Sequence, residues 1–180
     1  MTKSAVPFIT RFRIALGLFI AGLVTSGVTA FPLRAELRLL TQILGVGDAT
    51  SPQGYAGLDY WILTVRFGLE DTYARYPWVA YGTDWLAFGH LTIAIFFIGP
   101  FMNPLANKWA LRAGMIACAG VLPLALICGP LREIPFYWRL IDCSFGIIGV
   151  IPLVYCYKLL PRIAAEREAM NELNTAPRLR

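Results

Sequence analysis

The stretch YGTDWLAFGHLTIAIFFIGP, residues 81–100, indicates the fold class of this protein. It contains the only histidine of the chain, His90, and the nine residues that follow it include a single polar side chain, Thr92. An α-helix rises about 1.5 Å per residue, so an apolar run of this length suits the ~30 Å hydrocarbon core of a bilayer. The stretch therefore predicts a membrane-spanning helix with an imidazole inside it.

The composition supports the same interpretation along the whole chain. Of its 180 residues, 57% are hydrophobic and 15% are charged, whereas soluble domains carry about 25% charged residues. The apolar residues gather in four runs of span length, at about 14–33, 85–102, 110–131 and 140–160. Because helices satisfy their backbone groups internally in lipid, the sequence predicts an all-α polytopic membrane protein, a four-helix transmembrane bundle in one domain over residues 1–180.

The first apolar run has two interpretations. It follows a basic leader and ends near Val28-Thr29-Ala30, which resembles the cleavage site of a signal peptide. The leader contains Lys3, Arg11 and Arg13. The apolar character continues to Leu33, which favours a retained span. Whether residues 1–30 are a retained span or a cleaved signal stays open.

The distribution of charge predicts the orientation in the membrane. With four spans, the N-terminus, the loop between the second and third spans, and the tail 161–180 share one side, which carries ten of the 16 Lys and Arg residues. The other side carries six arginines and eight acids. Basic residues collect on the cytoplasmic side, so we expect a bacterial-type inner (plasma) membrane protein with both termini in the cytoplasm. The net charge of +5 is read as this topology, and no nucleic-acid partner is expected.

Residues 34–84 form the largest segment outside the predicted spans. RAELRLLTQIL predicts an amphipathic helix that continues the first span, whereas GVGDATSPQG is typical of a flexible turn and LDYWILTVRFGLEDTYARYP of a second helix with one apolar face. Its many aromatic side chains are the kind that settle at the level of lipid headgroups. We expect an amphipathic helical lid on the outer side, acting as a structural cap or as a gate or partner surface.

Small residues follow one side of several predicted spans. Glycine, alanine and threonine recur in the first, third and fourth spans, and such residues let transmembrane helices approach closely. They predict either packing within the bundle or contact with a partner chain. Pro123 and Pro152 lie inside the third and fourth spans, where each removes a backbone donor and favours a kink.

Ionisable side chains near the outer ends of the spans form the candidate polar site. It consists of Asp84, His90, Arg132, Glu133, Arg139 and Asp142. Intramembrane ionisable groups are functional candidates, and histidine titrates near neutral pH. A purely structural interpretation stays open. Asp84 or Thr83 would then cap the second span, Arg139 would pair with Asp142 one turn away, and His90 would donate to a backbone carbonyl.

Other chemistry receives little support from the sequence. The four cysteines form no CxxC pair, and no nucleotide-binding or hydrolase motif occurs, so we expect no metal and no cofactor. A disulfide between Cys128 and Cys143 stays open, since both fall near the outer ends of adjacent spans.

The sequence leaves three hypotheses about the function. The first hypothesis is a structural or accessory subunit that works with lipid and with a partner membrane subunit or in a homo-oligomer. The alternative is a small carrier or receptor whose polar, proton-responsive site opens to the outer side. The least supported is a membrane enzyme that acts on a lipid-like substrate, so an enzymatic role is not favoured.

Overall fold

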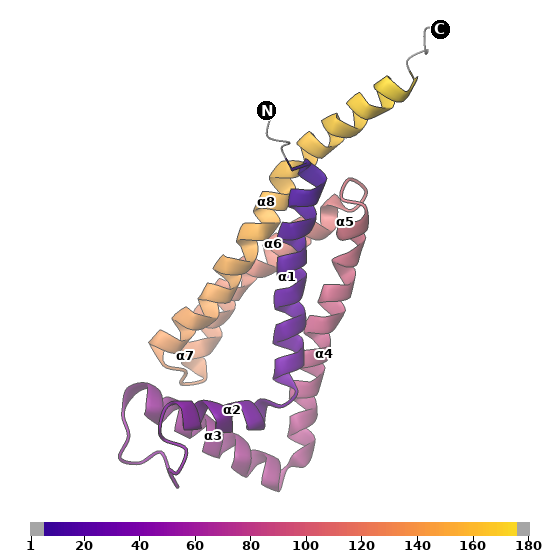
Figure 1. Ribbon diagram of the computed structural model, residues 1–180. Coiled ribbons are helices and arrows are strands. Elements are labelled where there is room, and N and C mark those ends of the chain that lie inside the picture. Colours follow the sequence, from indigo (N-terminus) through magenta and orange to yellow (C-terminus); the bar gives the residue numbers. More distant parts are fainter. Residues whose placement is uncertain (1–5, 176–180) are drawn as a thin grey trace. The chain divides into compact units, whose positions relative to one another are not determined.

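The computed structural model describes residues 6–175, and this part of the chain is helical without a β-strand (Figure 1). The α-helices are α1 (Phe8–Ala30), α2 (Leu33–Ile43), α3 (Gly57–Arg75), α4 (Ala80–Phe96), α5 (Ile98–Met102), α6 (Lys108–Pro123), α7 (Gly129–Leu131) and α8 (Phe136–Thr175). A 3₁₀ turn covers Pro77–Val79 and a π-helical turn covers Leu124–Cys128. Three residues of the charge argument, Lys3, Arg178 and Arg180, lie outside the described residues.

Within residues 6–175, four segments are long and apolar enough to cross a membrane. They are Phe8–Ala30, Pro77–Met102, Lys108–Leu131 and Phe136–Glu172. The predicted all-α fold with four transmembrane helices is therefore confirmed. Two further helices, α2 and α3, lie outside these segments and between the first two along the chain.

The chain folds as two compact units. One unit contains residues 22–94, and the other contains residues 1–21 together with 95–180. The boundaries fall inside α1 and α4, so each of these helices contributes residues to both units.

In the unit of residues 22–94, the first span and the amphipathic helix that follows it are two separate helices. The span ends at Ala30, before its predicted end, and α2 begins at Leu33 after a turn at Phe31 and Pro32. Proline has no N–H to donate to a continuing helix, yet its carbonyl can open the next one. The Pro32 carbonyl accepts from the backbone N–H of Glu36 at 3.0 Å. The break at this proline makes α2 a helix of its own.

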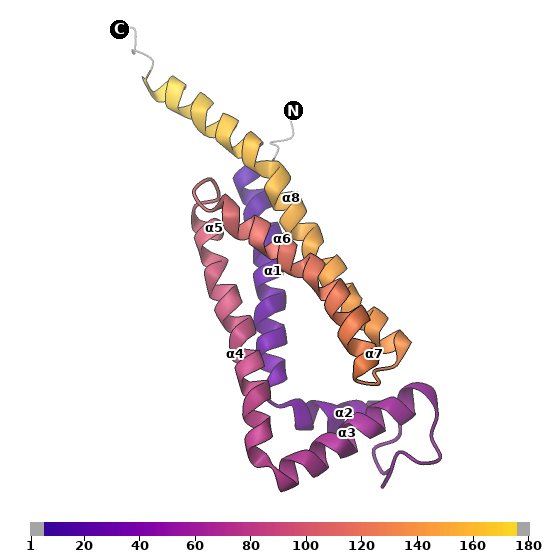
Figure 2. The same ribbon diagram turned by 180° about the vertical axis from the view of Figure 1, so that it is seen from behind.

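The helices α2 and α3 run side by side and share a small core, as both views show (Figures 1 and 2). Its buried side chains are Leu37, Thr41, Val46, Ile62 and Leu63. The chain leaves α2 through Gly45, which has φ +74°. The N–H of Gly45 bonds the Gln42 carbonyl and that of Val46 bonds the Thr41 carbonyl, the pattern of a Schellman helix stop.

The second span begins earlier than its predicted start at residue 85. Pro77 opens the 3₁₀ turn, and α4 follows it directly from Ala80. Asp84 and Thr83 therefore lie inside the helix, so the interpretation of either residue as its cap is wrong. The backbone of α4 lies against α1, because an added Cβ on Gly27 would stand 3.0 Å from the Ala87 carbonyl oxygen.

In the other unit, α6 packs beside the first part of α8, and α8 then continues beyond α6 (Figures 1 and 2). A Cβ added to Gly146 would collide with the Cys118 carbonyl oxygen, and one added to Gly149 would lie 3.2 Å from the Cys118 Sγ. On α6, a Cβ added to Gly114 would come within 2.9 Å of Leu153. These predicted small residues do bring two helices together, as close helix contacts in membranes require.

Two prolines have different effects within this unit. After Pro123 the helix widens into the π turn Leu124–Cys128, whereas Pro152 lies inside the continuous helix α8. A π turn is one of the ways in which a helix accommodates an interruption of its hydrogen bonds. Helix α8 also continues past Pro161, so it extends well beyond the predicted span end at residue 160.

Candidate functional site

The six residues of the predicted polar site divide between the two units. Asp84 and His90 belong to the unit of residues 22–94. The other four, Arg132, Glu133, Arg139 and Asp142, belong to the unit that contains α6–α8. Each part of the predicted cluster is therefore described within its own unit.

His90 bonds to its own helix. Its Nδ1 lies 2.9 Å from the Leu86 carbonyl oxygen, one turn earlier on α4. Because a carbonyl only accepts, Nδ1 carries the proton of this bond, and Nε2 is the acceptor nitrogen of the neutral ring. The Nε2 of the imidazole can therefore accept a hydrogen bond from a second group.

Asp84 lines a hollow of about 670 Å³ that lies within its own unit. We call it the α2–α4 hollow, and it takes polar residues from α2, from the end of α3 and from the start of α4. Its lining consists of Phe31, Pro32, Arg34, Ala35, Arg38, Leu39, Gln42, Tyr73, Ala80, Thr83 and Asp84. The hollow is a broadly open depression and not an enclosed cavity, although its volume falls within the range of about 300 to 1,000 Å³ of small-molecule sites.

A chain of hydroxyl groups borders the α2–α4 hollow. The Thr83 hydroxyl donates to the Ala80 carbonyl at 2.6 Å, so its single proton is used. The Tyr73 hydroxyl lies 3.0 Å from the Thr83 oxygen and must therefore donate to it. The Tyr73 oxygen keeps its own acceptor capacity towards the hollow.

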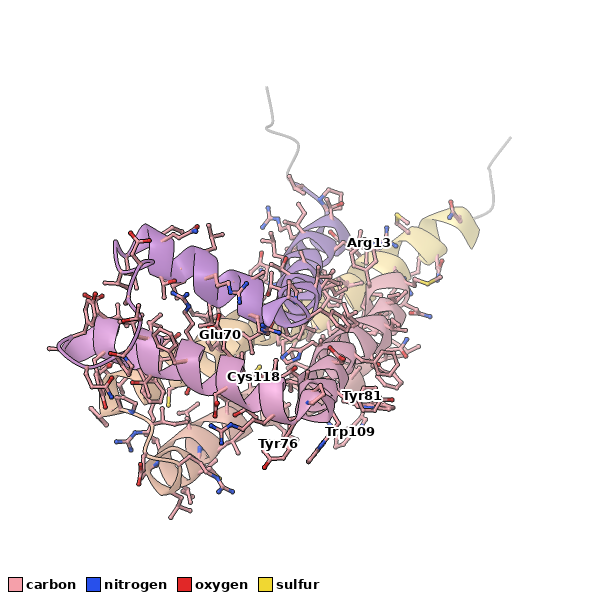
Figure 3. All side chains as sticks on the ribbon, turned by 90° about the horizontal axis from the view of Figure 1, so that it is seen from below. Arg13, Glu70, Tyr76, Tyr81, Trp109 and Cys118 are labelled. Atoms are coloured by element: carbon pink, nitrogen blue, oxygen red, sulfur yellow. The ribbon has the colours of Figure 1, made fainter. Side chains whose placement is uncertain are left out.

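Two arginines, of which Arg38 lines this hollow, share one carboxylate. The Nε of Arg38 donates to Glu70 at 2.8 Å, and the Nε of Arg66 lies 3.6 Å from the same oxygen. Figure 3 shows Glu70 between α2 and α3. Arg66 also donates to the Thr41 hydroxyl at 3.2 Å and to the Gly47 carbonyl at 3.1 Å. The three charged groups together keep one net positive charge.

The two guanidinium groups change the ionisation of Glu70. The hydrogen bond from Arg38 is the main reason that the pKa of Glu70 lies below its usual range. Partial burial of the carboxyl acts in the opposite direction, and the attraction of Arg38 and Arg66 adds to the lowering. Glu70 is therefore held as a carboxylate to lower pH than an isolated glutamate.

Asp142 lines a second hollow, of about 200 Å³, in the unit that contains α6–α8. The π turn supplies Leu124, Ala125 and Cys128 to its wall, and Arg132 lies on the same wall. The structure thus brings Asp142 and Arg132 to one hollow, as the predicted cluster requires of this pair. Single π turns occur frequently at functional sites, which makes this hollow the second candidate.

Arg139 and Glu133 lie at the turn between α7 and α8 and take their positions from it. The predicted ion pair of Arg139 with Asp142 is absent; instead the Arg139 stem lies against Gly129, where an added Cβ would stand 2.8 Å from its Cγ. Its guanidinium lies 5.1 Å from the Phe136 ring centroid. Glu133 has φ +58°, a conformation that glycine adopts more easily. Both residues are placed by the turn and not by Asp142.

The cysteines and the other possible metal ligands stay apart. All four cysteines are free, so the disulfide between Cys128 and Cys143 that the sequence left open is not formed. Within residues 6–175, no group of three His, Cys, Asp or Glu side chains is arranged to hold a metal ion.

Sequence reasoning missed the positive side of the α2–α4 hollow. It assigned Arg34 and Arg38 to the charge balance of an outer segment, and it did not place Tyr73 near Thr83. A signal was present, because Arg34 and Arg38 are four residues apart and lie on one side of an amphipathic helix. The sequence pattern did not indicate the turn at Pro32, after which this helix begins as a separate element.

In the part of the chain that the structure describes, the fold is that of a helical protein with four segments able to span a membrane, and both hollows described above are lined in part by charged residues. No protein-family model, no curated protein and no solved structure matches this chain.

Proposed function

We propose that this protein is an accessory subunit of a membrane assembly, in which a helix of another chain packs against α4. One observation carries the proposal: a Cβ added to Gly82 or Gly89 would meet nothing within 4 Å. The two glycines are about two helical turns apart, so they lie on one side of α4. The buried Ala87 and Ala94 lie on the opposite side.

The physical argument concerns close approach in lipid. Apolar tails do not drive apolar helices together, so helix association in a bilayer depends on small residues that let the backbones touch. The most apolar window of each span segment is only 17–22% buried within the chain. On this side of α4 the glycines lie above and below the exposed Trp85 and Leu86, so a partner helix can place its own side chains over the glycines and pack against these two larger residues.

Substitution of Gly89 tests the proposal. Gly89→Leu should lower recovery of a stoichiometric partner or of the oligomer by about tenfold, the result of losing about 1.4 kcal/mol of association. The measurement is the composition and mass of the protein purified in a mild detergent. Gly68→Leu is the matched control, because Gly68 is equally open but lies on α3, outside the span segments. A single chain at native levels, insensitive to Gly89→Leu, would contradict the proposal.

We also infer an inner-membrane location with both termini in the cytoplasm, supported by the excess of basic residues on the side of the termini. Gln53→Cys and Ala169→Cys, each made in a chain without native cysteines, test this orientation. A membrane-impermeant thiol reagent added to intact cells should label the first and spare the second. The reverse labelling would invert the topology.

A second candidate function is a small carrier or receptor that binds a polar, protonatable ligand. The hollow shared by Asp142 and Arg132 favours it, together with the unused Nε2 of His90. Asp142→Asn and His90→Ala, in protein that still folds, should each weaken ligand or proton responses measured in vesicles. Ser144→Ala is a suitable control, because its hydroxyl bonds only its own helix at Ile141. Unchanged responses in both variants would exclude this function.

A further inference from the structure

The α2–α4 hollow has a charge arrangement that the proposed function does not use. Among residues 6–175, Arg34 has no hydrogen-bond or ion-pair partner, and Arg38 uses only its Nε, at Glu70. The terminal amino groups of both guanidiniums remain for a ligand. Asp84, from α4, lines the same hollow and forms no ion pair there. The lining therefore offers two cationic groups on α2 and one carboxylate on α4.

The position of the hollow along the chain sets its depth in the membrane. Its lining begins directly after the first span segment, which ends at Ala30, and includes the first residues of the second, which starts at Pro77. The aromatic side chains around that start are exposed: Tyr76, Trp78, Tyr81 and Trp85. Figure 3 labels Tyr76 and Tyr81 among them. Exposed Trp and Tyr at a span end are typical of the headgroup region.

We propose that the α2–α4 hollow binds a phosphate ester that carries a primary amine, with Arg34 and Arg38 on the phosphate and Asp84 on the ammonium group. The headgroup of an aminophospholipid has this chemistry, and so does free phosphoethanolamine. Guanidinium groups bind phosphate through two parallel charge-assisted hydrogen bonds. The carboxylate disfavours a purely anionic ligand and accepts hydrogen bonds from an ammonium group.

The neighbouring charges agree with this assignment. Arg38 of α2, with Arg66 and Glu70 of α3, keeps one net positive charge, and Arg34 adds a second positive charge to the α2 side of the hollow. The Tyr73 hydroxyl donates to Thr83, so its oxygen can accept a hydrogen bond from the ammonium group of the ligand. Phe31, Pro32 and Leu39 give the hollow an apolar border, suited to the carbon chain of a lipid glycerol ester.

Binding to the full chain in detergent, followed by native mass spectrometry, tests the proposal. The probes are phosphatidylethanolamine, phosphatidylglycerol, free phosphoethanolamine and inorganic phosphate. We expect phosphatidylethanolamine to bind about tenfold more tightly than phosphatidylglycerol, since one charge-assisted bond separates them. Arg34→Ala should weaken both lipids by about tenfold. Asp84→Asn should remove the preference for the amine and leave binding of phosphatidylglycerol unchanged or stronger.

The choice of variants separates an effect on lipid binding from an effect on folding. Arg34 makes no bond in the structure, so its loss leaves the packing of α2 on α3 intact, unlike the loss of Arg38. Arg75→Ala removes a guanidinium that pairs only with Asp71 and does not line the hollow, so lipid binding should not change.

The probes also separate the two sources of the ligand. Displacement of the lipid by free phosphoethanolamine assigns the site to the headgroup chemistry alone, and failure to displace it assigns the site to a lipid; both support the proposal. Equal binding of the two lipids, competition by inorganic phosphate as strong as by phosphoethanolamine, or wild-type binding by Arg34→Ala overturns it.

Discussion

Where α6 meets α8, the contact is made by glycine and backbone, whereas α2 and α3 are joined by charged side chains. Gly146 stands so close to the Cys118 carbonyl that no side chain fits between the helices. Glu70 of α3, in contrast, reaches Arg38 of α2 across a hydrogen bond of 2.8 Å. The first pair belongs to segments apolar enough for lipid, and the second does not.

The difference follows from the solvent that each pair of helices meets. Hydrocarbon cannot drive apolar surfaces together, so contact there depends on shape and on small residues. Water can drive burial, so α2 and α3 bury a few large side chains and place their charges at the edge. The chain thus joins α6 to α8 by close backbone packing, and α2 to α3 by a small apolar core with an ion pair at its edge.

The largest expected effect is the loss of the glycine contact between α6 and α8. Gly146→Ala should lower the free energy of unfolding by about 1–3 kcal/mol, because the new methyl group collides with the Cys118 carbonyl. Unfolding in mixed detergent micelles measures it. Gly120→Ala is the control in the same unit, because nothing lies within 4 Å of its added Cβ and alanine favours the helix. Equal effects of the two changes would contradict the packing argument.

A similar loss is expected in the polar unit from Arg66→Ala. This side chain is only 15% exposed, and its removal leaves the Gly47 carbonyl without its donor. We expect a cost of about 1–3 kcal/mol and faster amide exchange in the loop after α2. Arg75→Ala should cost at most about 0.5 kcal/mol, because its pair with Asp71 is exposed on both sides. Identical exchange in the two variants would reject this contrast.

One helix stop occurs in both units with different residues. Gly45 ends α2 at φ +74°, and Glu133 occupies the equivalent place after α7 at φ +58° with the same pair of backbone bonds. Glu133→Gly should therefore stabilise its unit by about 1 kcal/mol, and Gly45→Ala should destabilise the other by a similar amount. Thermal unfolding measures both. The interpretation fails if glycine at position 133 lowers the melting temperature.

The smallest expected effect is the response of the polar unit to acid. The pKa of Glu70 is lower in the folded chain, so its contribution to stability is complete above about pH 5 and is lost as the pH falls below about 4. Amide exchange in α2 should accelerate over that range in the natural chain. The Glu70→Gln variant should show no such acceleration, and an unchanged acid response in it would assign the effect to other carboxylates.

The sequence predicted the fold better than the site, for a physical reason. Each span is a local property, because a long apolar run must form a helix in lipid. The start of the second span was missed because Pro77 opens a turn before the apolar run. The contribution of small residues in the third and fourth spans was predictable for the same local reason, and Gly146 and Gly149 confirm it.

The site depends on contacts that spacing alone does not determine. Arg139 and Asp142 have the spacing of a helical ion pair, yet the Arg139 stem packs on Gly129. Asp84 was recognised from its place near a span, but Arg34 and Arg38 were not joined to it. Their meeting depends on the break at Pro32, which periodicity does not report.

The π turn at Leu124–Cys128 also changes the direction, about the helix axis, in which the side chains after it point. A π turn holds one residue more than an α turn, so the following side chains are rotated by about 100° from where an uninterrupted helix would put them. Gly129 reaches the Arg139 stem in this rotated frame. Deleting one residue within the turn would restore a regular helix and point a different residue at Arg139, so the length of this segment matters as much as its composition.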